Sequence, residues 1–254
     1  MAGANDWLAT YQGLLADAGV SPSDLAPQAS LPVSESDGPS LAQCLARPDR
    51  VRSDFGAGLS EQGLRVRASV MQQSLALSVL TPVVLRFLLT GASHLPGDDA
   101  LRLVANPDDS LDLWACDQPR PSASLHTLDQ LFDTLAGRAR AWYPVFRKGL
   151  GVSPGAYWSS IGLGFCAPFS MLYDRSEPDR LCQQASLWLD SFDCDARRYI
   201  EWIPAMREQG LCAIPQRRGC CLKFKLPERG YCGTCSIHRR ERMSALALGL
   251  TPEL

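Results

Sequence analysis

The sequence predicts an α+β fold that is predominantly helical, with one small β-hairpin and a cysteine-rich segment near the C-terminus. Apolar residues recur at helical spacing along most of the 254 residues, which is typical of amphipathic helices. Two short extended runs, 101–104 and 111–115, flank a turn-forming stretch at 106–110 and indicate the hairpin. Four of the ten cysteines fall between residues 220 and 235, which sets this segment apart from the helical part.

The N-terminal region, residues 1–58, is predicted to hold one helix and a long irregular connection. Trp7, Tyr11 and Leu14 share one face of a helix over residues 6–18. Beyond this helix, Pro, Ser, Gly and Asp are frequent and helical periodicity is weak. We therefore expect an irregular chain there, with one short helical turn near residues 41–46.

Residues 59–206 are predicted to form a mostly helical core. Ser60 can cap a helix that runs toward Leu80. Pro82 then either kinks this helix or begins a second one, because proline lacks the amide that helix interiors need. Gly91 is placed to end that helix.

Three further helices and a shorter one are predicted after the hairpin. Residues 127–130 form a capping-box pattern ahead of apolar residues at helical spacing. The pair Ser153–Pro154 is a typical cap and first-turn proline, and Pro178 begins another amphipathic helix. A shorter helix is expected within 196–206, before a C-terminal segment, 207–254, that carries the clustered cysteines. The three regions can also form a single domain.

The sequence favours a cytoplasmic location. The first residues lack the basic and apolar regions of a secretory signal. The most apolar stretch, residues 75–89, contains Pro82 and Arg86, and it is too short and interrupted to span a bilayer. We interpret it as a buried helix, while loose attachment to a membrane surface stays open. In a reducing compartment, clustered cysteines indicate metal binding or catalysis and disfavour disulfides.

Charge is distributed unevenly along the chain. The net charge of −2 gives the whole molecule no bias toward nucleic acid. Residues 215–242, however, contain eight basic side chains against Glu228 and Glu241, which gives this segment +6. The clustered cysteines lie inside this basic segment. Such charges ordinarily form a solvated surface. Alternatively, they surround an electron-accepting centre and stabilise its added negative charge.

The clustered cysteines have the pattern Cys220-Cys221-x10-Cys232-x2-Cys235. The second pair can chelate one centre through a tight turn. Adjacent cysteines in an extended strand point to opposite sides, so the first pair requires a bend, for which Gly219 offers the backbone freedom. The other six cysteines are scattered and are interpreted as small buried hydrophobes: Cys44, Cys116, Cys166, Cys182, Cys194 and Cys212.

Four thiolates suit either tetrahedral zinc or an iron–sulfur cluster. Adjacent cysteines match the usual zinc spacing poorly, whereas a [2Fe–2S] core spreads its ligand positions over two irons. The residues therefore favour a [2Fe–2S] cluster and leave a structural zinc site open. A thioredoxin-like motif is disfavoured because no βαβ context surrounds the second pair. His238 is either a hydrogen-bond donor to the centre, an alternative ligand or, as we favour, part of the basic segment.

The C-terminal pattern resembles that of the FhuF family of ferric siderophore reductases, which are [2Fe–2S] proteins. The agreement includes the cysteine spacing, its place near the chain end and the chain length, and residues 157–169 are similar to the family's tryptophan-containing central helix. The resemblance implies that Cys220, Cys221, Cys232 and Cys235 ligate a [2Fe–2S] cluster. No residue of the first half can be assigned a role through it.

The leading hypothesis is an enzyme, a cytoplasmic ferric siderophore reductase that releases iron by one-electron reduction. The alternatives are a siderophore-binding or regulatory module with a structural zinc site, and a general iron–sulfur electron carrier. The sequence shows no nucleotide-binding fingerprint and no acid–base constellation. We therefore expect a separate electron donor, such as a ferredoxin or an NAD(P)H-dependent reductase, and no catalytic residue beyond the cluster.

Overall fold

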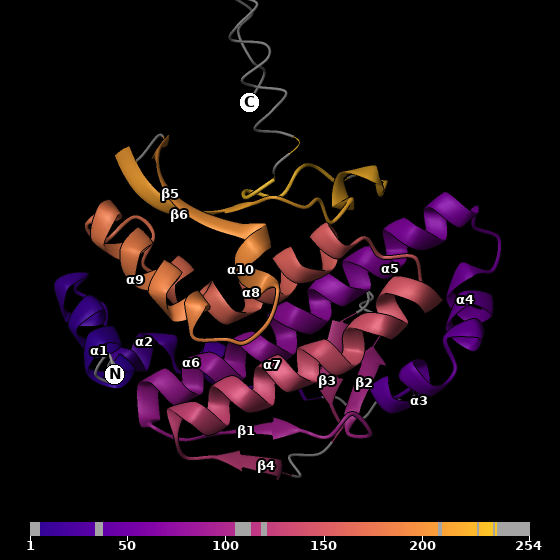
Figure 1. The fold of residues 1–254 in the computed structure, drawn as a ribbon, viewed down its shortest axis with the longest axis horizontal. Coiled ribbons are helices and arrows are strands. Elements are labelled where there is room, and N and C mark those ends of the chain that lie inside the picture. The colour runs from indigo at the N-terminus through magenta and orange to yellow at the C-terminus, as the bar shows by residue number, and fades with distance from the viewer. Residues whose placement is uncertain are drawn as a thin grey trace, which may run out of the picture.

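The chain folds as a predominantly helical α+β protein, as the sequence predicts (Figure 1). The computed structural model describes residues 6–33, 38–104, 113–117, 121–207, 210–227, 229–235 and 237. Its α-helices are α1 (Trp7–Asp17), α2 (Pro22–Leu25), α3 (Leu41–Ala46), α4 (Pro48–Gly56), α5 (Glu61–Leu75), α6 (Thr81–Thr90), α7 (Leu128–Pro144), α8 (Pro154–Ser170), α9 (Pro178–Asp190) and α10 (Ala196–Tyr199). Shorter helical turns are η1 (Pro27–Ala29), η2 (Ala76–Leu80), η3 (Val145–Gly149) and η4 (Lys223–Lys225).

The described part of the chain holds three antiparallel strand pairs where the sequence predicts one. The strands are β1 (Ser93–Pro96), β2 (Leu101–Val104), β3 (Leu113–Cys116), β4 (Pro121–Leu125), β5 (Ile200–Arg207) and β6 (Gly210–Arg217). The pair β2–β3 confirms the pairing of the two predicted runs, with Leu101 opposite Cys116, and the predicted turn at 106–110 lies outside the described residues. The pairs β1–β4 and β5–β6 are additional.

The largest error of the prediction concerns residues 196–206, where only Ala196–Tyr199 is helical. The following residues form β5, which pairs with β6 from Ile200–Arg217 at one end to Arg207–Gly210 at the other. Ile200 and Trp202 are buried, whereas Glu201 between them is exposed. This alternation is typical of a strand with one face on the core, and it outweighs the helical spacing.

The N-terminal connection is also more helical than predicted. The turn at 41–46 is confirmed as α3, but α2 and α4 were not expected. Both begin with a proline, Pro22 and Pro48, at the first helical position, where the missing amide costs nothing. Ser21 caps α2 through its hydroxyl, which accepts from the Ser23 amide at 3.3 Å.

Helices α5 and α6 run on through a π-helical turn, η2, directly before Pro82. Such a turn accommodates the carbonyl that proline leaves without a donor. Gly91 ends the helix with φ of 75°, as predicted. By length and composition the stretch Glu61–Thr90 could cross a membrane, but 67% of its most apolar window is buried inside the fold. It therefore packs as a core helix.

Helix α8 lies at the centre of the molecule (Figure 1). Ser153 caps it as predicted, because its hydroxyl accepts from the Ala156 amide at 3.1 Å. The helix continues two residues beyond Pro168, whose carbonyl accepts from the Tyr11 hydroxyl at 3.0 Å. Trp158 is buried and belongs to the hydrophobic core. Because α8 is buried along most of its length, it is a rigid base for segments packed against its N-terminal end.

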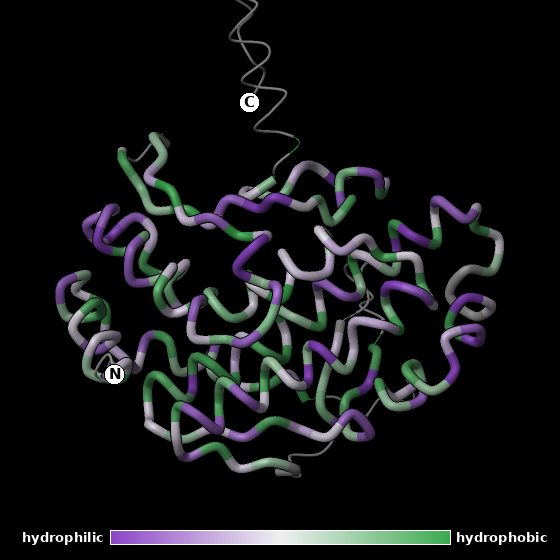
Figure 2. Tube along the Cα trace, in the orientation of Figure 1, coloured by the Kyte–Doolittle hydropathy of each residue, from purple (hydrophilic) through white to green (hydrophobic). Residues whose placement is uncertain are grey.

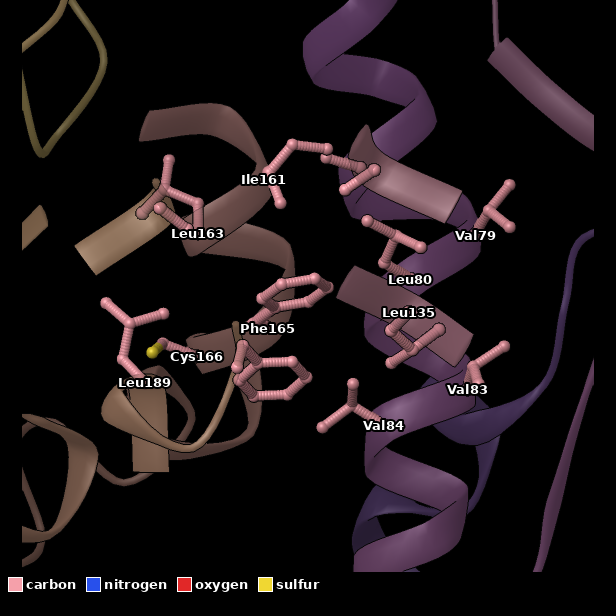
Figure 3. Packing of buried hydrophobic residues seen from close by; sticks show 14 of the residues in the cluster. Val79, Leu80, Val83, Val84, Leu135, Ile161, Leu163, Phe165, Cys166 and Leu189 are labelled. Carbon is pink, nitrogen blue, oxygen red and sulfur yellow. The ribbon is translucent and has the colours of Figure 1, made fainter. Parts of the chain in front are cut away.

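The hydrophobic core is one cluster that draws residues from Trp7 to Ala213. Figure 2 shows apolar residues along the inner helices and polar residues on the outer turns. In Figure 3, side chains of α8 such as Phe165 face Leu80 and Val84 across the core. The division of the chain at residues 58 and 206 stays a prediction.

Trp188 of α9 is the aromatic centre of this core. Its ring lies 5.3 Å from that of Trp7 and 5.1 Å from that of Phe132, and its indole nitrogen donates to the Phe165 carbonyl at 2.8 Å. We expect Trp188→Ala to lower the free energy of unfolding by about 3–5 kcal/mol, because it opens a cavity between three helices. Chemical denaturation measures this loss. Leu187→Ala, at an exposed neighbour, is the control, and equal losses for both variants would contradict the assignment.

Candidate iron–sulfur site

The clustered cysteines lie in a segment that follows β6 and crosses the N-terminal end of α8. Figure 1 shows this segment, residues 218–235, running from the β5–β6 hairpin toward α5. Its short helix η4 contacts α5. The backbone amide of Arg217 at the end of β6 donates to the Thr234 carbonyl at 3.3 Å, which joins the two ends of the cysteine motif.

The bend that the adjacent cysteines require is present, but it does not lie at Gly219. Leu222 adopts a left-handed conformation, with φ of 64°, and its amide points back to the Cys220 sulfur at 3.3 Å. Gly219 has another role. A Cβ built on it would lie 2.0 Å from the backbone of Gly155 in α8. Glycine is therefore required there for close approach of two backbones and not for a positive φ.

The second cysteine pair forms the expected tight turn. The Cys235 amide donates to the Cys232 carbonyl at 2.9 Å, and the hydroxyl of Thr234 lies 3.9 Å from the Cys232 sulfur. Such a turn places two thiols on the same side of the backbone, as chelation requires.

The four thiols interact with one another in pairs. The pKa of Cys220 is lowered, chiefly by a hydrogen bond with the Cys221 thiol, and Cys220 also interacts with Cys235. The pKa of Cys232 is raised, first by a hydrogen bond with Cys221 and then by burial. Cys221 and Cys235 are buried, while Cys220 and Cys232 are half-buried. A cluster held here would be shielded on one side and reachable by electrons on the other.

The preference for two bridged irons over one metal ion rests on ligand chemistry. Within the described residues, no group of three or more His, Cys, Asp or Glu side chains is arranged to hold a single ion. A tetrahedral zinc site needs four sulfurs around one point. A [2Fe–2S] core takes two sulfurs on each of two irons, so it accepts a wider set of four thiols.

A buried cation beside the thiols provides an independent test of fit. Arg217 is 1% exposed, and its Nη1 atom is buried without a hydrogen-bond partner. Its charge counteracts the raised pKa of Cys232. A buried guanidinium is costly unless an anion lies nearby, and a core with four thiolate ligands is an anion. The surroundings of the thiols therefore fit a negatively charged centre. Sequence reasoning placed Arg217 only in the basic segment.

The rest of the basic segment is partly described. Arg218 pairs with Glu201 at 3.2 Å, Lys225 is exposed and Lys223 is half-buried. Residues 228, 236 and 238–254 lie outside the described residues, and with them His238 and the last three arginines of the segment. The predicted roles of His238 stay untested.

An open groove adjoins the cysteine segment. It has a volume of about 630 Å³, and Arg218, two residues before Cys220, forms part of its wall. Arg197 pairs with Asp190 across this wall at 2.6 Å. The lining residues that the structure describes belong to α9, α10, β5 and the segment: Ser186, Leu189, Asp190, Arg197, Arg198, Ile200, Glu201, Trp202 and Arg218.

The other cysteines behave differently from the clustered ones. Five of the six are buried, as predicted, and Cys194 is half-buried. Burial raises the pKa of Cys166 to about 12 and that of Cys44 to about 11. The pKa of Cys232 is raised too, but there the nearby charge of Arg217 acts in the opposite direction.

The cysteine segment matches a known iron–sulfur domain. A family model described as the FhuF 2Fe-2S C-terminal domain matches residues 217–235, and the four clustered cysteines fit its motif. The match covers the cysteine segment alone, and it supports membership of the chain in the FhuF family. The cofactor of this domain is a [2Fe–2S] cluster. A search of curated proteins gives no match.

The glycine contact between the segment and α8 yields a prediction. Gly219→Ala should lower the free energy of unfolding by about 1–3 kcal/mol, since the added methyl group overlaps the Gly155 backbone. It should also reduce the amount of cluster retained during purification. Thermal unfolding and the visible absorbance of anaerobic protein measure the two effects.

Gly230→Ala is the matched control for this prediction. Gly230 lies in the same segment, and a Cβ there would meet nothing within 4 Å. If both variants unfold at the same temperature and retain the same amount of cluster, the close approach of Gly219 to α8 is wrong.

Proposed function

We propose that this protein is a cytoplasmic ferric siderophore reductase whose [2Fe–2S] cluster is ligated by Cys220, Cys221, Cys232 and Cys235. The observation that carries the proposal is that the segment holding these four cysteines matches a 2Fe-2S domain. The half-buried positions of Cys220 and Cys232 support transfer of electrons to an external substrate.

The chemistry requires little of the protein beyond positioning. Siderophores bind Fe³⁺ through hard oxygen ligands, and Fe²⁺ is held far more weakly because its charge is smaller. The bound cluster supplies single electrons. The substrate iron gains one electron and leaves as Fe²⁺, and no proton or group is transferred. The chain therefore needs a docking place near the cysteine segment, and it needs no general acid or base.

We propose the groove beside Arg218 as that docking place. Its volume of about 630 Å³ lies within the range of about 300–1,000 Å³ typical of ligand sites. Its charged residues are largely paired with each other, as Arg197 is with Asp190 and Arg218 with Glu201. A polar wall with balanced charge suits an oxygen-rich chelate of low net charge.

The electron donor is a separate partner in this proposal. Lys223 and Lys225 lie on η4, on the side of the cysteine segment that faces α5. Neither lysine forms an ion pair within the described ranges. A donor with an acidic docking surface, such as a ferredoxin or an NAD(P)H-dependent reductase, fits these charges.

Iron release tests the reaction. Prereduced protein, mixed anaerobically with ferric siderophores and a ferrous chelator, should release Fe²⁺ faster than a Cys232→Ser variant, because that variant lacks one thiolate ligand. Absorbance of the ferrous chelate measures the release. Circular dichroism should show that the variant keeps most of its helices. If none of the siderophores loses its iron, the reductase assignment is contradicted. The alternative of a general electron carrier then remains.

A substitution in the groove tests the docking place. Ser186→Trp should reduce the rate of siderophore-iron release by about tenfold or more, equivalent to ~1.4 kcal/mol of lost binding. Reduction of ferricyanide, which is small enough to need no groove, should be unchanged. Leu187→Trp, on the same helix but outside the groove, is the control. Equal rates for Ser186→Trp and wild type would exclude the groove.

A further inference from the structure

Arg217 is the only fully buried charged residue in the described part of the chain. It stands at the end of β6, three residues before the first ligand of the proposed centre. Buried cations in proteins are normally paired with carboxylates, because an unpaired charge loses its hydration without compensation. Arg217 has no ion pair among the residues that the structure describes. Burial of this charge therefore indicates a nearby anion that the described side chains do not supply.

The hydrogen bonds of Arg217 hold the side chain firmly without neutralising it. Nε donates to the Ser159 hydroxyl at 3.0 Å, and Nη2 donates to the hydroxyls of Ser159 and Ser160 at 2.8 and 2.9 Å. Nη2 also lies 3.3 Å from the Ala156 carbonyl. All these acceptors are neutral groups of α8. The guanidinium is therefore fixed in direction while its full positive charge remains.

One nitrogen of the guanidinium, Nη1, takes part in none of these hydrogen bonds. Nη1 is buried and has no partner, although a guanidinium donor in the protein interior is rarely left unsatisfied. The turn of the second cysteine pair lies against this end of β6. The Arg217 amide and the Gln216 side chain both donate to the Thr234 carbonyl at 3.3 Å, and Thr234 stands between Cys232 and Cys235.

We propose that Arg217 Nη1 donates a hydrogen bond to a sulfur of the bound [2Fe–2S] cluster, and that this buried charge raises the reduction potential of the cluster. A core with four thiolates carries two negative charges when oxidised and three when reduced, so a nearby cation stabilises the reduced form more. Arg217 is thus a positioning and tuning residue. The inference depends on the cluster and not on the siderophore substrate.

The reduction potential tests the charge. Arg217→Met should shift the one-electron equilibrium toward the oxidised form by tenfold or more, which is 59 mV or more toward negative potential. Arg217→Lys keeps the charge and should recover part of the shift. Lys225→Met removes an exposed charge from the same segment and should shift the potential far less. A potential for Arg217→Met equal to that of Lys225→Met would overturn the proposal.

A spectroscopic measurement on the wild-type protein tests the hydrogen bond, in case Arg217→Met does not retain the cluster. The protein is labelled with arginine carrying ¹⁵N in the guanidinium group, and the cluster is reduced to its paramagnetic form. Electron–nuclear double resonance should detect a ¹⁵N coupling that is absent from labelled Arg217→Lys and present in labelled Arg218→Lys. A labelled wild-type protein without this coupling would overturn the proposal. Neither measurement contains a siderophore, so failure of iron release is distinguished from failure of this inference.

Discussion

The structure depends on the docking of the cysteine segment against the N-terminal end of α8. Two contacts make this docking possible. The backbones of Gly155 and Gly219 meet so closely that no side chain fits between them. Beside them Arg217 donates to the serines of α8, so the segment is held by one steric and one polar contact. A segment with little regular secondary structure of its own acquires a fixed position from a helix that is buried along most of its length.

Local signals in the sequence predict most helices of this fold. Capping residues such as Ser60, Thr127 and Ser153 act through backbone amides three residues away, so their effect can be predicted without tertiary structure. The strand β5 could not be predicted in this way, because its residues fit helical spacing until β6 supplies a partner. Pairing between strands is a tertiary contact that competes with local preference.

In the candidate site, too, local features are visible in the sequence and tertiary contacts are not. The spacing of the four cysteines is visible in the sequence, and the structure adds pairwise interactions between their thiols. The role of Arg217 is not visible, since it is one of eight basic residues in its segment and only burial distinguishes it. Gly219 was interpreted as a flexible position, yet its constraint comes from α8, 64 residues away in the sequence at Gly155. Constraints from distant segments leave no local pattern.

The chain keeps its two kinds of cysteine apart by environment. Burial among apolar side chains raises the pKa of Cys166 to about 12, so this thiol stays protonated. The clustered thiols lie in a basic segment, and the charge of the buried Arg217 counteracts the raised pKa of Cys232. In the proposal above, the same charge also favours the added electron once a cluster is bound, because reduction increases the negative charge of the cluster. A single buried arginine can therefore set the affinity of the centre for electrons. Neutral hydroxyl acceptors on α8 leave the charge of this arginine intact, whereas a carboxylate partner would cancel it.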